Sequence, residues 1–157
     1  MSLATIQSRA LLGVDALAVT VETHLSNGLP AFAIVGLPET AVKESKERVR
    51  SAIINSGLEF PTRRITVNLA PADLPKAGGS YDLAIALSIL IASGQLKRRM
   101  LENMEVLGEL ALDGSIRAVP GTVCAILAAK RQANKILLPA ANTEELLIKN
   151  KTIKITN

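Results

Sequence analysis

Residues 16–35 read ALAVTVETHLSNGLPAFAIV and hold two strand patterns separated by a turn signal. Apolar and polar residues alternate from Val19 to His24, which is the period of two typical of a half-buried β-strand. Asn27-Gly28 is the dipeptide that most strongly favours a tight type I′ turn, because both central positions of that turn need a positive φ. This stretch therefore predicts a β-hairpin, with strands over residues 16–25 and 31–35.

On either side of this stretch, strand and helix patterns follow one another along the chain. Pro38 suits the first turn of a helix, and Asp113-Gly114 marks a second tight hairpin turn. The patterns predict strands over residues 3–10, 64–69, 105–112, 115–119, 135–138 (buried) and 152–155. They predict helices over residues 38–56, 81–93, 122–134 and 143–149. This mixture predicts an α/β (α+β) fold with a mixed sheet, two β-hairpins and three main helices, and not a doubly wound dinucleotide-binding fold.

Composition indicates a single domain over residues 1–157. Of the 157 residues 48% are hydrophobic, and no linker rich in Pro, Gly or Ser interrupts the chain. Only 2% are aromatic, so the core is expected to be aliphatic, and a base-stacking platform for single strands is disfavoured. No apolar run approaches the roughly 20 residues that span a bilayer, and one cysteine excludes a disulfide framework. A cytoplasmic protein without membrane contact is the simplest interpretation.

The residues needed for several common kinds of chemistry are missing. No G-x-x-x-x-G-K-[ST] motif occurs, so the sequence holds no P-loop for nucleotide phosphates. His24 is the single histidine and Cys124 the single cysteine, which excludes a histidine-based triad and a His or Cys cluster for a metal ion. Asp82, near a helix start, is interpreted as a partner of the helix dipole or cap. We therefore expect no metal site and no cofactor in these residues.

Basic residues gather in short runs, and the formal net charge is +4. Two interpretations stay open: the runs are ordinary solvated faces, or several of them converge into a surface that contacts phosphates. Such contacts would hold a nucleic acid without reading its sequence. The candidates for nucleic-acid contact are Arg63, Arg64, Lys76, Lys97, Arg98 and Arg99.

Three long stretches point to a family. They begin at His24 (HLSNGLPAFAIVGLPETAVKESKERVRSAI), at Arg63 (RRITVNLAPADLPKAGGSYDLAIAL) and at Leu107 (LGELALDGSIRAVPG). Together they resemble the N-terminal domain of the YifB/ComM family of magnesium chelatase-like AAA+ proteins. The resemblance implies a longer protein whose ATPase domain, outside this sequence, binds ATP and Mg²⁺ and forms a homo-oligomeric ring. It also implies DNA processing, including helicase or branch-migration work on single-stranded or branched DNA and natural transformation.

The same domain is similar to the proteolytic domain of Lon and to the C-terminal domain of RadA. These share the fold of the second domain of ribosomal protein S-five. Lon uses a serine activated by a lysine, and residues 76–80 fit its K-x-G-x-S pattern, so the resemblance places Ser80 at the nucleophile. It places Val123 at the lysine position, and a valine cannot take the hydroxyl proton. The resemblance therefore implies that this chain is not itself an enzyme.

The sequence is compatible with three functions. The first is a non-catalytic scaffold that packs beside its own ATPase domain and guides DNA. The second is a Lon-type serine peptidase using Ser80, which needs a lysine amine within hydrogen-bond reach of the Ser80 hydroxyl. The third is a protein-interaction module with an exposed apolar patch. Val123 at the lysine position favours the first over the second.

Overall fold

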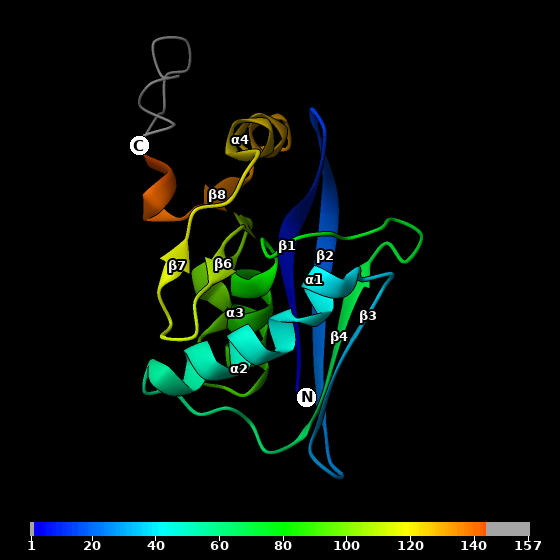
Figure 1. Ribbon diagram of the computed structural model, residues 1–157, viewed down its shortest axis with the longest axis vertical. Helices are drawn as coiled ribbons and strands as arrows, with labels where there is room; N and C mark the ends of the chain where they lie inside the picture. Colours follow the sequence, from blue (N-terminus) through cyan, green and yellow to red (C-terminus); the bar gives the residue numbers. More distant parts are fainter. Residues whose placement is uncertain (1, 144–157) are drawn as a thin grey trace.

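The chain forms a six-stranded mixed sheet with helices against one face (Figure 1). The computed structural model describes residues 2–143. The strands are β1 (Leu3–Leu12), β2 (Asp15–Ser26), β3 (Ala31–Val35), β4 (Arg64–Ala70), β5 (Met104–Val106), β6 (Glu109–Leu110), β7 (Ile116–Arg117) and β8 (Lys135–Leu137). The helices are α1 (Thr40–Lys43), α2 (Ser45–Asn55), α3 (Asp82–Ala92) and α4 (Thr122–Arg131), with 3₁₀ turns η1 (Arg98–Leu101) and η2 (Ala140–Asn142). The predicted strand 152–155, and all but the first residue of helix 143–149, lie outside the described residues.

The large sheet has the strand order β3-β4-β2-β1-β5-β8. β1 and β2 form a long antiparallel hairpin in which Leu12 pairs with Asp15. β2 is antiparallel to β4, whereas β3–β4, β1–β5 and β5–β8 are parallel pairs. Parallel neighbours need a crossover connection, and α1 with α2 supplies it between β3 and β4. The predicted mixed sheet and α/β class are confirmed.

The tight hairpin predicted at Asn27-Gly28 is wrong. β2 and β3 lie where the pattern places them, but β4 inserts between them. Arg64 of β4 pairs with Ser26 on one side and with Ala31 on the other. The loop between β2 and β3 therefore spans two strand spacings, roughly 10 Å, instead of one. Pro30 in this loop has no N–H, so it cannot donate to a ladder directly between the two strands.

Alternation along the strands decides which face of the sheet is covered. In β4, Ile65, Val67 and Leu69 are buried, and the residues between them lie on the more open face. α3 packs on β1 and β2, and α2 packs on α3, so both helices cover the same side of the sheet (Figure 1). The core is aliphatic, as predicted, apart from buried Tyr81. Among residues 2–143, no helix has the length and apolar content that crossing a membrane requires.

Two predicted elements are each divided in the structure. Helix 38–56 becomes α1 and α2, which meet at Glu44. Strand 105–112 becomes β5 and β6. At that break the Gly108 N–H donates to the Ser80 carbonyl, and the Gly108 carbonyl accepts from Leu83 N–H. The backbone therefore bonds to the start of α3 at the point where a continuous strand would bond to a neighbour.

The sequence patterns predicted the positions of the remaining short strands, but not the exposure of all of them. β6 and β7 pair in antiparallel fashion across Asp113-Gly114, which confirms the second predicted hairpin. β8 occupies the predicted residues, but it is an edge strand in which Lys135 and Leu137 are exposed. The expected burial of this strand is wrong, because it has a neighbour on one side only.

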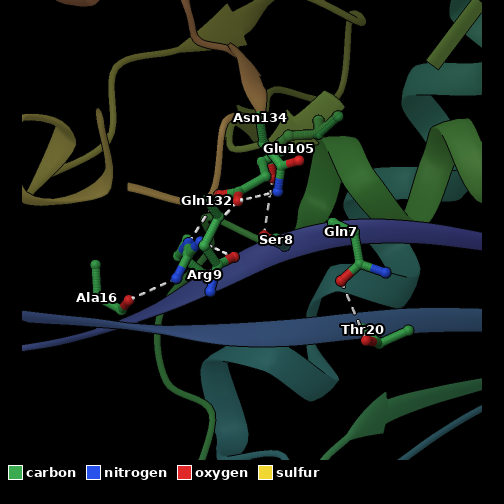
Figure 2. Close-up of polar contacts among 9 residues, drawn as sticks. Gln7, Ser8, Arg9, Ala16, Thr20, Glu105, Gln132 and Asn134 are labelled. Atoms are coloured by element: carbon green, nitrogen blue, oxygen red, sulfur yellow. Dashed lines mark hydrogen bonds and ion pairs between the residues drawn. The ribbon is translucent and has the colours of Figure 1, made fainter. Parts of the chain in front are cut away.

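A buried ion pair joins the middle of the sheet to the residues after α4 (Figure 2). Arg9 of β1 donates from Nε and Nη2 to the two oxygens of Glu105, each at 2.7 Å. Arg9 also donates to Gln132 Oε1 and to the Ala16 carbonyl, and Asn134 Nδ2 donates to Glu105 Oε1 at 3.0 Å. Every charged atom of the pair is bonded, which is the condition under which a buried ion pair is tolerated.

Candidate functional site

Ser80 lies in the loop that leads into α3. The residue is 9% exposed, and its carbonyl accepts from Gly108 N–H at 3.0 Å. The preceding Gly79 packs against a carboxylate, because a Cβ added there would lie 2.8 Å from Glu109 Oε2. The loop that carries this serine therefore packs closely against β6, and the serine itself is mostly buried.

Lys76, four residues before Ser80, is buried. Its Nζ donates to the Gly36 carbonyl at 2.6 Å and to the Pro71 carbonyl. Burial lowers the pKa of Lys76 from its ordinary 10.5. The amine is thus committed to two backbone carbonyls and holds the 71–79 loop against the turn after β3. Its predicted role as a surface phosphate contact is wrong, since the side chain does not reach solvent.

Val123 occupies the second position of α4 and is half-buried. An isopropyl group has no lone pair, so it cannot act as the base that activates a serine. Lys76, the lysine nearest to Ser80 in sequence, donates to backbone carbonyls instead. No lysine amine of residues 2–143 forms a hydrogen bond with the Ser80 hydroxyl.

One arginine from each of two basic runs, 63–64 and 97–99, contacts the start of the chain, near the N-terminus marked in Figure 1. Arg63 donates from Nη1 to Ser2 Oγ at 2.9 Å and from Nη2 to the Leu25 carbonyl at 3.3 Å. Arg98 donates from Nη2 to the Leu3 carbonyl at 2.6 Å. Both guanidinium groups therefore contact the first residues of the chain. We refer to the following residues as the basic end: Arg63, Arg64, Lys97, Arg98 and Arg99.

Within the basic end, exposure differs from residue to residue. Arg64 is exposed at the first position of β4, and Arg63 before it is half-buried. Lys97, Arg98 and Arg99 are exposed around η1. Five of the six candidates for nucleic-acid contact thus reach solvent at least in part, and Lys76 does not.

Asp82 is a buried partner of α2 and not a helix cap. Its carboxylate accepts from Ser45 Oγ at 2.5 Å, from Arg48 Nε at 2.6 Å and from Leu110 N–H at 3.1 Å. The bond from Arg48 to Asp82 is the main cause that raises the pKa of Arg48 above its ordinary value. Asp82 does lie in the first turn of α3, where an acidic side chain suits the helix dipole, but it makes no capping bond, because its donors come from elements distant in sequence. The carboxylate holds α2, α3 and β6 together.

A cavity that the sequence did not indicate lies beside the basic end. Its volume is about 400 Å³, and it opens between α2, β3 and the segment before β4. Phe32 and Phe60, the two phenylalanines of the chain, both line it, and their ring centroids are 5.8 Å apart. Arg63 also lines it. The sequence shows only that the chain has two phenylalanines. It does not show that their rings stack on one another.

The described residues offer little to a metal ion. Within residues 2–143, no group of three His, Cys, Asp or Glu side chains is arranged to hold one. His24 is exposed on β2, and Cys124 is a free, half-buried thiol on α4.

Comparisons with known proteins agree with the sequence motifs. Residues 21–142 match the model of a family described as subunit ChlI of Mg-chelatase. The YifB protein of Salmonella typhimurium is 56% identical over 146 residues, which are 93% of this chain and 29% of that protein. The competence protein ComM of Haemophilus influenzae is 53% identical over 145 residues, which are 92% of this chain and 28% of that protein.

A more distant match is Lon protease of Clostridioides difficile, 27% identical over 134 residues that cover 80% of this chain and 17% of that protein. The chain thus spans less than a third of the YifB and ComM proteins that it matches. The family model covers well over half of the chain. The chain therefore belongs to the magnesium chelatase-like family, together with the YifB and ComM proteins.

Proposed function

We propose that the chain is the non-catalytic N-terminal module of a magnesium chelatase-like AAA+ ATPase, and that its basic end guides nucleic acid during DNA processing. The observation that carries this proposal is the meeting of two basic runs, before β4 and around η1, against the first residues of the chain. Exposed cations brought together from distant positions favour a polyanionic partner, because each one contributes to phosphate contact.

In this proposal the rest of the longer protein supplies the ATPase. ATP and Mg²⁺ bind there, since residues 1–157 contain no P-loop motif. The partners of the module are its own ATPase domain, further copies of the protein in a ring, and single-stranded or branched DNA, all in the cytoplasm. The link to natural transformation is supported by the name of the ComM relative, a competence protein.

A Lon-type serine peptidase is the second candidate, because Ser80 fits the Lon pattern and a Lon protease is among the relatives. Two observations weigh against it. Lys76 Nζ bonds to backbone carbonyls, and Val123 stands at the lysine position. A serine without a positioned base is a poor nucleophile. The non-catalytic module is therefore the better-supported function.

Titration with DNA tests the proposed module. We expect the 157-residue chain to bind labelled single-stranded and branched DNA at about 50 mM salt and to lose most of that affinity by about 200 mM, because phosphate contacts release counterions. Fluorescence anisotropy over this salt range measures the slope of log K against log salt. The variants Arg64→Glu and Arg99→Glu are each expected to reduce that slope by about one.

Matched charge reversals outside the basic end serve as controls. Lys43 on α1 and Arg117 on β7 are exposed cations, and α1 lies beyond the opposite end of β3 from Arg64. Lys43→Glu and Arg117→Glu make the same change of net charge and should leave the salt slope as it is. Equal losses in all four variants would mean that net charge, and not the basic end, attracts DNA. Absence of binding at low salt would remove the DNA-guiding role.

Chemical labelling tests the peptidase. We expect an activated serine probe, such as a fluorophosphonate, to leave Ser80 unlabelled, since no base is in place to take its proton. Mass spectrometry of the treated chain measures the label. Labelling that disappears in Ser80→Ala would establish a reactive serine and overturn the non-catalytic assignment.

A further inference from the structure

The cavity beside the basic end has the size and lining of a ligand site. Its volume of about 400 Å³ falls within the roughly 300–1,000 Å³ typical of small-molecule sites. Its walls come from three elements: α2, the start of β3 and the segment that precedes β4. The side chains that give it its chemistry are Phe32, Phe60, Lys46, Arg50, Arg63 and Glu47.

Both phenylalanines of the chain present their rings to this one cavity. Phe32 and Phe60 stack with an interplanar angle of 26° and are half-buried, so part of the aromatic surface stays accessible. Aromatic surface in a basic groove is what single-stranded nucleic acids use, because every base has a π-face that stacks on it. The scarcity of aromatic residues disfavoured such a platform, but the two phenylalanines of the chain lie side by side.

Cations surround the rings. Arg50 Cζ lies 5.7 Å from the centroid of the Phe60 ring, within the range of a cation–π contact. Lys46, one helical turn earlier on α2, lines the same wall, and Arg63 lines the opposite segment. Against these three cations stands one anion, Glu47. The balance favours an occupant with negative charge beside a flat, unsaturated group.

A second cavity lies on the same segment before β4, and Arg63 of the basic end lines both cavities. A smaller cavity of about 210 Å³ shares Pro61, Thr62 and Arg63 with the first and extends toward Gln95. Arg63 reaches from these cavities to Ser2, close to the contact of Arg98 with Leu3. A chain of phosphates that leaves the cavity would pass Arg63 and the basic end, a distance that a free nucleotide does not span.

We infer that the Phe32–Phe60 cavity takes an unstacked base of a single-stranded nucleic acid, while Lys46, Arg50 and Arg63 contact the adjoining phosphates. This inference rests on the proposed function and adds to it a place where the base, as well as the backbone, is held. Such a cavity makes the module prefer single strands, because the bases of a duplex are stacked on their neighbours and cannot enter the cavity.

The test compares two labelled strands of equal length and equal charge. One is an ordinary single-stranded oligodeoxynucleotide, and the other is an abasic strand with the same number of phosphates. Fluorescence anisotropy at low salt should show that the chain binds the ordinary strand about tenfold more tightly. In Phe60→Leu this preference should disappear, because leucine fills similar space without a π-face. Affinity for the abasic strand should stay unchanged.

Two further variants keep the result interpretable. Leu58→Ala alters an exposed apolar residue of the same segment that does not line this cavity, and it should keep the preference for the ordinary strand. Arg50→Gln alters an exposed side chain, so its folding is not at risk, and it should weaken binding of both strands. Circular dichroism confirms that each variant is folded.

The possible outcomes separate the inference from the function on which it rests. Equal affinity for the two strands, with no effect of Phe60→Leu, would overturn the base pocket and leave the phosphate-guiding module standing. Failure to bind either strand would overturn both. Binding of a peptide rich in Asp and Glu that depends on Phe60, together with no preference between the strands, would show that the cavity takes an acidic peptide instead.

Discussion

Single buried side chains hold this fold at points where the chain carries no regular pairing. Asp82 accepts hydrogen bonds from three residues of α2 and β6, and Lys76 bonds to two carbonyls of neighbouring loops. Each is a buried member of a charged residue type that is usually exposed. Their burial is tolerated because their hydrogen-bond partners are provided by the surrounding elements.

Tyr81 offers a direct measure of burial at the residue scale. It is the single tyrosine, it is 1% exposed, and burial raises its pKa from 10.0 to about 12. The folded chain keeps the phenol protonated at a pH at which the unfolded chain loses the proton. The contribution of Tyr81 to the free energy of unfolding is therefore complete below pH 10.0 and is lost as the pH rises toward about 12.

Ultraviolet absorbance follows this titration without interference from tryptophan, which the chain lacks. We expect the folded chain to form tyrosinate near pH 12 and the chain in concentrated guanidinium to form it near pH 10.0. In Tyr81→Phe, the fall in unfolding free energy over that interval should be smaller than in the unaltered chain. A folded chain that titrates at the same pH as the denatured chain would contradict the buried position.

At the scale of elements, the pairing of β3 with β4 depends on one close backbone approach. Gly36 follows β3 with φ +103°, and a Cβ added there would lie 2.2 Å from the Leu69 carbonyl oxygen of β4. Its own carbonyl accepts from Lys76 Nζ. Only a glycine satisfies both the backbone angle and the space, so this position controls how β3 leaves the sheet and how the 71–79 loop docks.

We expect Gly36→Ala to lower the free energy of unfolding by roughly 3 kcal/mol, as backbone strain and steric overlap add. Gly13 provides a matched control, because it has φ +60° but no atom within 4 Å of an added Cβ. Gly13→Ala should cost only the strain, about 1–2 kcal/mol. Urea denaturation of the two variants measures the difference. Equal losses would mean that the contact with Leu69 does not constrain the sheet.

At the scale of the molecule, polar side chains join the two hydrophobic clusters found within residues 2–143. The larger cluster lies between the sheet and helices α2 and α3, and a smaller one contains Leu107, Val119 and Ala125 near α4. The Arg9–Glu105 pair, with its bonds to Gln132 and Asn134, connects β1 and β5 with the residues after α4 (Figure 2).

Removing one charge of this pair tests the connection. Glu105→Gln keeps the shape of the side chain but leaves the Arg9 charge buried without its counter-ion, which should cost about 3–5 kcal/mol. Glu102→Gln, an exposed change in the preceding turn, should stay within about 0.5 kcal/mol of the unaltered chain. Urea denaturation measures both. A small effect at Glu105 would show that Arg9 finds solvent once its partner is neutral.

The sequence motifs predicted much of the candidate site. The remaining features depend on contacts between residues that are distant in sequence. The stretches that begin at His24, Arg63 and Leu107 were sufficient for the family, and the exposed basic runs were visible as charge clusters. The burial of Lys76 and the meeting of Phe32 with Phe60 were not visible. Nothing in a window of neighbouring residues shows which carbonyls or rings lie across from a side chain.

Local pattern was enough to place nearly all the described strands and the main helices, because alternation and turn preference act between residues close in the chain. It could not show that β4 separates β2 from β3, that Gly108 interrupts a strand, or that Asp82 binds Arg48. Those features depend on which packing of the elements buries the most apolar surface and satisfies the most hydrogen bonds. The free energy that selects this packing comes from contacts between residues far apart in sequence.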